Sequence, residues 1–141
     1  MRKRTKAREC ALQVLYQIDI TSDEPDVSLK GYWQDNRESE DIMEFTAKLV
    51  QGACQKKCEI DRLIAMYAEN WTIARMAVVD RNILRMAAYE LLYCPDVPAK
   101  VCINEAIDLA KKFGDAESGK FVNGIIDRIH KENKKDAVNT G

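Results

Sequence analysis

Residues 73–93 read IARMAVVDRNILRMAAYELLY, and this stretch decides the fold class. Apolar side chains recur in it at helical spacing in two adjoining stripes, so the predicted helix is apolar on more than half of its circumference. The first stripe is Met76, Val79, Ile83, Met86 and Leu91, and the second is Leu84, Ala88 and Leu92. A helix of this kind is central in a domain and covered by other helices. We expect Thr72 to cap its start, and the prolines at 95 and 98 to end it sharply.

Amphipathic helices are predicted on both sides of the central stretch. Apolar residues recur every three or four positions in the ranges 5–20, 39–54, 60–67, 100–113 and 118–130. Residues 22–40 are polar and acidic, and we expect a loop there with a short helix around 29–33. No segment has the two-residue period of a β-strand. The sequence therefore predicts an all-α fold of six or seven helices.

The composition agrees with a single domain spanning residues 1–141, with a basic arm at 1–8 and a polar tail at 131–141. The chain is 46% hydrophobic and 32% charged, which suffices for a core without disulfide or metal staples. No run of 18 apolar residues occurs, and no apolar stretch follows the basic N-terminus, so neither a membrane span nor a signal peptide is expected. Together with the five cysteines, this predicts a protein of the reducing cytoplasm.

Charge is distributed unevenly along the chain. Of the 22 basic side chains, five lie within the first eight residues, namely Arg2, Lys3, Arg4, Lys6 and Arg8. The remaining 133 residues hold 17 basic and 23 acidic side chains. Cations at the start of a helix oppose the helix dipole, so stability alone does not account for the arm. A basic arm on an acidic body favours contact with nucleic acid, and the alternative is a solvated segment without a role.

The start of the last predicted helix carries a second candidate site. Lys120 and Phe121 lie next to each other in its first turn, after Ser118, which can cap the helix. Free N–H groups in a first turn attract anions, and an aromatic ring stacks bases, so the pair suits single-stranded RNA. The alternative is a core phenylalanine beside a solvated lysine. We also expect Gly114 to end the preceding helix in the left-handed conformation, and Gly124 to allow close approach of another backbone.

No residue pattern predicts catalysis, a metal or a cofactor. Residues 114–120 match the G-x4-G-K part of a phosphate-binding loop, but Phe121 stands where a magnesium ligand is needed and the segment follows a helix. Cys54 and Cys58 are four residues apart, yet the remaining ligands of a zinc site are missing, and the single histidine, His130, is distant in sequence. We therefore expect a non-enzymatic protein without metal or cofactor.

Five motifs stand out along the chain, namely RTKARECALQVLY at 4–16, DRNILRMAAYEL at 80–91, DVP at 96–98, VCINEAIDLAK at 101–111 and SGKFVNG at 118–124. Together they resemble the NusB family of transcription antitermination factors. These motifs come in the order of the family and span nearly the whole chain. The resemblance implies two small helical bundles packed together and a role in RNA binding without chemistry.

The resemblance also implies partners and site residues. Members of the family bind the boxA element of ribosomal RNA transcripts with the small-subunit ribosomal protein NusE, on RNA polymerase, to control transcription termination. The implied RNA contacts are Arg2, Lys3, Arg4, Lys6 and Arg8 of the arm, with Glu117, Ser118, Lys120 and Phe121. Tyr16 and Asp80 would face NusE, while Arg85 and Glu90 are structural or interface residues. The acidic residues beside Lys120 predict modest affinity for RNA alone.

A second interpretation comes from a different class of protein. A helical adaptor that binds only other proteins would also have amphipathic helices and no catalytic residues. Tyr16 supports a protein contact in either case, since it lies two residues from Val14 and from Ile18, about 200° around the helix from that apolar face. The two interpretations differ in the salt dependence of binding to a boxA-like RNA.

Overall fold

The computed structural model describes residues 2–140, with side chains up to residue 133. Its elements are α1 (Lys3–Thr21), α2 (Pro25–Asp35), α3 (Glu40–Gln55), α4 (Lys57–Tyr67), the 3-10 helix η1 (Ile73–Arg75), α5 (Val78–Tyr93), α6 (Ala99–Phe113) and α7 (Ser118–Thr140). Seven α-helices and no strand within these residues confirm the all-α prediction. The last helix continues through most of the polar segment 131–141, of which Gly141 lies outside the described residues. No described helix is long and apolar enough to span a membrane.

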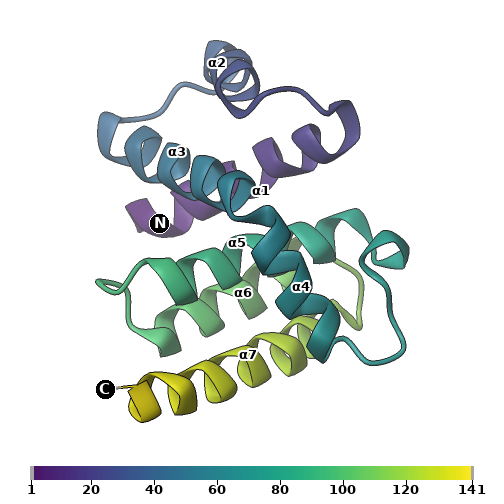
Figure 1. The fold of residues 1–141 in the computed structure, drawn as a ribbon. Helices are drawn as coiled ribbons and strands as arrows, with labels where there is room; N and C mark the ends of the chain where they lie inside the picture. The colour runs from purple at the N-terminus through teal and green to yellow at the C-terminus, as the bar shows by residue number, and fades with distance from the viewer. Residues whose placement is uncertain (1, 141) are drawn as a thin grey trace.

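The helices form two packed groups on either side of α5. Helices α1, α2 and α3 make the upper group in Figure 1, and α4, α6 and α7 lie below them with α5 between the two. Helix α5 packs against α1, α3, α4, α6 and α7, as expected for a helix that is apolar on most sides. The prediction of a central helix in this part of the chain is therefore confirmed.

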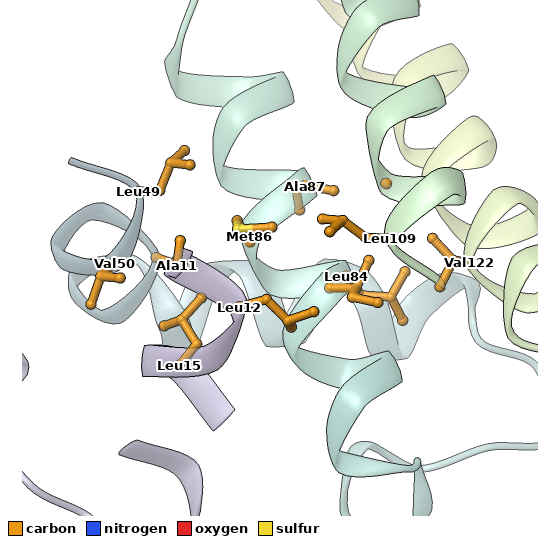
Figure 2. Packing of buried hydrophobic residues seen from close by; sticks show 14 of the residues in the cluster. Ala11, Leu12, Leu15, Leu49, Val50, Leu84, Met86, Ala87, Leu109 and Val122 are labelled. Atoms are coloured by element: carbon orange, nitrogen blue, oxygen red, sulfur yellow. The ribbon is translucent and has the colours of Figure 1, made fainter. Parts of the chain in front are cut away.

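The core extends through α5 from one group to the other. Figure 2 shows Met86 beside Leu12 of α1 and Leu49 of α3, whereas Leu84 lies toward Leu109 of α6 and Val122 of α7. All are almost completely removed from solvent. Burying one large aliphatic side chain contributes roughly 1.5–3 kcal/mol, so this continuous core is the main source of stability.

The central helix begins later than the sequence pattern predicts. Residues 73–75 form the 3-10 helix η1, the backbone at Met76 is extended with φ −67° and ψ 148°, and α5 starts at Val78. Thr72 makes no side-chain cap hydrogen bond. Met76 is still buried, and the Arg81 guanidinium donates to the Ile73 carbonyl at 3.3 Å, which ties η1 to α5. The break brings η1 next to the start of α7.

The segment 22–40 is more helical than expected. Helix α2 is 11 residues long and has Pro25 at its first position, where proline is well tolerated. Leu29 is buried, and Tyr32 and Trp33 pack against the core with their rings edge-on at 5.1 Å. These three apolar side chains explain why an otherwise polar segment is held on the surface of α1 and α3.

Two expectations about glycines are wrong. Gly114 has φ −93°, so it is not left-handed. Position 114 has no room for a side chain, because an added Cβ would overlap the Ser118 side chain and lie 2.8 Å from the Ala110 carbonyl oxygen. Gly124 has nothing within 4 Å of an added Cβ. The close approach occurs at Gly52 instead, where a Cβ would overlap the Tyr89 ring.

Candidate nucleic-acid interface

Residues 3–8 of the basic arm form the first turns of α1, and Arg2 stands immediately before the helix. Lys3 lies 2.9 Å from the Asp41 carboxylate, and Arg4 lies 3.5 Å from Asp96 with its guanidinium 4.4 Å from the centre of the Phe45 ring. The side chains in both ion pairs are more than half exposed. Exposed pairs of this kind contribute about 1 kcal/mol or less. Phosphate groups can therefore displace both carboxylates at little cost.

Arg8 does not lie on the exposed face of the arm. Its side chain is 3% exposed, and its Nε donates to the Glu90 carboxylate at 2.9 Å, with Nη2 donating to the same group. Its Nη1 lies 3.5 Å from Glu105. Although burial by itself lowers the pKa of Arg8, the hydrogen bond and charge of Glu90 hold that pKa above its ordinary value. The structure thus places Arg8 in the interior between α1 and α5, away from the RNA-facing surface expected for it.

The turn before α7 is organised by hydrogen bonds of Asp115 and Ser118. The Asp115 N–H donates to Ser118 Oγ at 3.0 Å, and Ser118 Oγ donates to Asp115 Oδ1 at 3.2 Å. The same Oδ1 accepts from the Glu117 N–H at 2.9 Å. These bonds satisfy the N–H groups of Asp115 and Glu117 in the turn before α7, and Ser118, which was expected to cap the helix, is its first residue. Ser118 is 1% exposed and fixes the turn, whereas Glu117 and Lys120 are exposed on its surface.

A hollow of about 650 Å³ lies between η1, α5 and α7. Trp71 and Arg75 line it from the side of η1, Asp80 from the first turn of α5, and Lys120 and Phe121 from α7. The Trp71 ring meets the half-buried Phe121 edge-on, with centroids 6.3 Å apart and an interplanar angle of 77°. The hollow therefore brings together residues that the sequence analysis assigned separately to RNA and to NusE.

Asp80 is the unexpected member of this group. It is 8% exposed, and its Oδ1 is buried without a hydrogen-bond partner within residues 2–133. Its position in the first turn of α5 favours a negative charge because of the helix dipole. Even so, a buried carboxylate oxygen without a donor is uncommon. Tyr16, which like Asp80 was expected to face NusE, is 39% exposed on α1.

The arm and the hollow lie at opposite ends of α6. Thr5 Oγ1 donates to Glu105 at 2.8 Å, and Lys112 near the end of α6 lies 2.9 Å from Glu9, so α1 and α6 run in the same direction. Figure 1 shows the N-terminus on the left and the start of α7 on the right. Helix α6 has 15 residues and is about 22 Å long. The two expected sets of RNA contacts are therefore not in contact with each other.

A groove of about 420 Å³ between α1 and α6 connects the two ends. Arg2 lines one end of it and Lys112 the other, with Val101 and Leu109 between them. Among its acidic residues, Glu9 is paired with Lys112. Glu105 and Asp108 also line the groove, so its charge is mixed, and it shares no lining residue with the hollow.

Comparison with known proteins assigns the chain to a family. The sequence model of the NusB family matches residues 5–131. The chain belongs to the NusB family. The transcription antitermination protein NusB of Desulfatibacillum aliphaticivorans is 50% identical over 130 residues, which cover 92% of this chain and 91% of that protein. NusB of Syntrophus aciditrophicus (strain SB) is 44% identical over 142 residues, which cover 98% of this chain and 88% of that protein.

Solved NusB structures have the same fold. T. maritima NusB superposes with a TM-score of 0.83 at 39% identity, covering 92% of this chain and 91% of that one. A chain from the crystal structure of antitermination factors NusB and NusE in complex with double-stranded RNA superposes with a TM-score of 0.86 at 34% identity. The match covers 94% of this chain and 98% of that one. The resemblance to NusB seen in the sequence motifs is thereby confirmed.

Within this NusB-family chain, a second polar cluster has a structural role. The Asp19 carboxylate accepts from Arg81 through two bonds of 2.7 Å, from Asn82 at 2.8 Å and from Arg85 at 3.1 Å. The hydrogen bond from Arg81 is the main reason that the pKa of Asp19 falls to about 2. Because its acceptors are satisfied, the cluster holds α1 against α5. Arg85 here and Glu90 beside Arg8 are thus structural residues.

Two residues of the NusB hollow are not evident from the sequence pattern. Trp71 stands at the break before the central helix, and Arg75 falls within a range that reads as continuous helix. Both are exposed and come next to Lys120 only because η1 turns away from the axis of α5. The only feature of the sequence that could have indicated them is an aromatic residue followed four positions later by a cation, in a segment between two helices.

Proposed function

We propose that this chain is a transcription antitermination factor of the cytoplasm that binds boxA-like single-stranded RNA of ribosomal RNA transcripts together with NusE, on RNA polymerase. It acts by binding and catalyses no reaction. The observation that carries the proposal is the match to NusB antitermination proteins over nearly the full chain, combined with exposed cations on the first turn of α1. A structural relative that is 34% identical holds NusE and double-stranded RNA.

The exposed part of the arm supplies the phosphate contacts. Arg2, Lys3 and Arg4 are exposed and Lys6 is half-buried, whereas Arg8 is excluded by its burial against Glu90. Lys120 adds a contact at the other end of α6. It forms no ion pair with any side chain of residues 2–133, so no carboxylate must be displaced there.

The surface around these cations explains the need for a partner. Asp115 and Glu117 lie next to Lys120, and Asp41 and Asp96 lie next to the arm. Repulsion between these carboxylates and phosphates limits the affinity for RNA alone. NusE bound at Tyr16, an exposed amphipathic aromatic of the kind that anchors interfaces, would extend the contact surface.

The test is a titration of a fluorescently labelled boxA-like RNA at several salt concentrations, with and without NusE. A variant with Arg2, Lys3, Arg4 and Lys6 replaced by Gln should bind more weakly and lose up to about 3 from the log–log salt slope, at about 0.7 for each phosphate contact. The control replaces four exposed cations elsewhere, Lys30, Arg37, Lys57 and Arg62, with Gln. It should keep the wild-type slope.

The same titration separates RNA binding from the adaptor interpretation. A chain that binds NusE tightly but RNA with no salt-dependent affinity, alone or with NusE, would be a protein adaptor. Equal salt slopes for the arm variant and its control would remove the arm from the RNA site. Tyr16→Ala should weaken NusE binding and leave the affinity for RNA alone unchanged.

A further inference from the structure

The first turn of α1 carries exposed cations of the arm, although its own residues do not favour a helix start. Helix α1 begins at Lys3, Arg2 makes no side-chain cap hydrogen bond, and the first turn contains no acidic residue. The first hydrogen bond of the helix runs from the Lys6 N–H to the Arg2 carbonyl at 3.0 Å. Unpaired N–H groups and cations at this end are unfavourable next to the helix dipole, so the turn would fray without outside contacts.

Two of the outside contacts are exposed ion pairs. Lys3 pairs with Asp41 of α3, and Arg4 pairs with Asp96 in the connection between α5 and α6. All four side chains are more than half exposed. A phosphate that displaces either carboxylate also removes a contact that holds the turn on the rest of the fold. RNA binding as proposed would therefore loosen the turn from which the cations project.

The contact of Thr5 with Glu105 differs from these ion pairs. The Thr5 hydroxyl donates to Glu105 Oε1 at 2.8 Å, from α1 across to α6. Thr5 is half-buried and the Glu105 side chain is 14% exposed, with the same Oε1 3.5 Å from Arg8 Nη1. Because the threonine hydroxyl carries no charge and its acceptor is largely covered, a phosphate gains little by competing for this hydrogen bond.

We propose that the hydrogen bond from Thr5 to Glu105 keeps the first turn of α1 folded while RNA phosphates displace Asp41 and Asp96. Thr5 and Glu105 are thus positioning residues, which act on RNA affinity through the exposed cations without contacting RNA themselves. The inference rests on the proposed function and adds to it the contact that keeps the arm helical in the bound state.

The place of Thr5 in the helix supports this role. Arg8 and Glu9 follow it by three and four positions, and both are buried. Residues with these spacings share one face of a helix, so Thr5 continues the inner polar face of α1 by one turn toward the N-terminus. The buried pair of Arg8 with Glu90 fixes the helix one turn further on. It does not by itself prevent the residues before it from fraying.

The first experiment measures amide hydrogen exchange of the full chain by NMR, at low salt and in about 1 M NaCl, where the screening length is only about 3 Å. High salt weakens the exposed ion pairs in the way that phosphates would. In wild type, the amides of residues 6–8 should stay protected under both conditions. In Thr5→Val they should exchange about tenfold faster at high salt, and Thr5→Ser, which keeps the hydroxyl, should restore wild-type exchange.

A matched control is available at the other end of α1. The Thr21 hydroxyl donates to the Gln17 carbonyl at 3.0 Å. Thr21→Val therefore also removes one threonine hydroxyl and its hydrogen bond from this helix, far from the arm. It should leave the exchange of residues 6–8 and the affinity for RNA alone at their wild-type values.

The second experiment titrates a labelled boxA-like RNA at several salt concentrations. If Thr5→Val leaves the turn formed in about a fifth of the molecules, the Kd rises about fivefold, since the apparent Kd scales with the inverse of the competent fraction. The log–log salt slope should stay at its wild-type value because the exposed cations are unchanged. Thr5→Ser should restore the affinity, and Thr5→Val should have no further effect in a Glu105→Ala chain. A Thr5 that only stabilised the fold would lower the urea midpoint without changing the RNA affinity of the folded chain.

Four results would overturn the proposal. The first is loss of protection at residues 6–8 in wild type at high salt or with RNA bound, a result that needs no variant. The second is wild-type exchange and affinity in Thr5→Val. The third is a smaller salt slope in Thr5→Val, which would make the hydroxyl a direct RNA contact. The fourth is an equal effect of Thr5→Val with and without Glu105.

Failure of the proposed function would look different. A wild-type chain that binds no boxA-like RNA, alone or with NusE, removes the proposed function. The exchange measurements on the free chain would then still decide whether Thr5 and Glu105 hold the first turn of α1.

Discussion

Replacement of Arg8 by Gln should destabilise the fold far more than replacement of the other arm residues. The Arg8 and Glu90 side chains are 3% and 2% exposed, and Glu90 has Arg8 as its only ion-pair partner within residues 2–133. Arg8→Gln therefore leaves a buried carboxylate without its cation. Breaking a buried pair in this way costs about 3–5 kcal/mol, a large part of the roughly 5–15 kcal/mol that stabilises a domain of this size.

Two comparison variants separate the charge effect from the loss of packing. Arg8→Met combined with Glu90→Leu removes both charges and fills the space with apolar groups, which should cost about 1 kcal/mol or less. The four-residue arm variant that keeps Arg8 should also stay within about 1 kcal/mol of wild type, because its ion pairs are exposed. Its stability should even rise slightly, since cations at the start of α1 oppose the helix dipole.

Urea unfolding at pH 7, followed by circular dichroism, measures these differences. With a slope of about 1–3 kcal/mol per molar urea, a loss of 3–5 kcal/mol lowers the unfolding midpoint by roughly 2 M. The double replacement and the arm variant should unfold near the wild-type midpoint. An Arg8→Gln midpoint equal to that of wild type, or a double replacement as unstable as the single one, would refute the role of Arg8 as a buried structural cation.

Three further predictions concern other parts of the chain. Asp19→Asn should cost about 2 kcal/mol at pH 7. Hydrogen bonding by Arg81 lowers the pKa of Asp19 from 3.8 to about 2, so this stabilisation is present above pH 4 and lost as the pH falls toward 2. The difference in urea midpoint between wild type and Asp19→Asn should therefore narrow from pH 7 to pH 4 and pH 2.5. A difference that stays constant over these pH values would contradict the prediction. Gly124→Ala should raise stability by about 0.5–1 kcal/mol because its Cβ meets open space on α7, whereas Gly52→Ala should lower it through overlap with Tyr89, and thermal melts that rank the two the other way would disprove the packing. Glu117→Gln should tighten RNA binding and Lys120→Ala should weaken it with a salt slope smaller by about 0.7, and two wild-type-like titrations would remove this turn from the RNA site.

The regular helices could be predicted because their apolar residues keep one spacing over three or more turns. The interruption at 76–77 between η1 and α5 could not be predicted. Met76 and Val79 have the spacing of a continuous helix, although the backbone at Met76 is extended. Helix α2 was underestimated for a different reason. Its residues are mostly polar, and the few that pack against the core, such as Leu29 and Trp33, give too short a pattern.

The burial of Arg8 was in principle readable from the sequence. Arg8 shares the spacing of Ala11, Leu12 and Leu15, which are all buried on α1. The run of neighbouring cations obscured this periodicity. Glu90 is the only charged residue in the second half of α5, residues 86–93, and it is the matching signal, since a buried arginine needs a carboxylate partner.

The hollow could not be predicted from local patterns. Trp71 and Phe121 are 50 positions apart in sequence, and they meet because η1 leaves the axis of α5 just where α7 begins. Helix periodicity indicates which face of each helix is buried. It does not tell which of the irregular connections between helices come together.

The buried ion pair of Arg8 also bears on how the arm can bind RNA. Arg4 lies one helical turn before Arg8, and Lys3 is the first residue of the same helix. Because Arg8 holds α1 against α5, the exposed cations start from a formed helix instead of a disordered tail. Little backbone entropy then has to be lost when they contact phosphates, which favours binding by a small number of contacts. The same basic segment thus combines one buried cation that fixes its position with exposed cations that are free to make the proposed contacts with RNA.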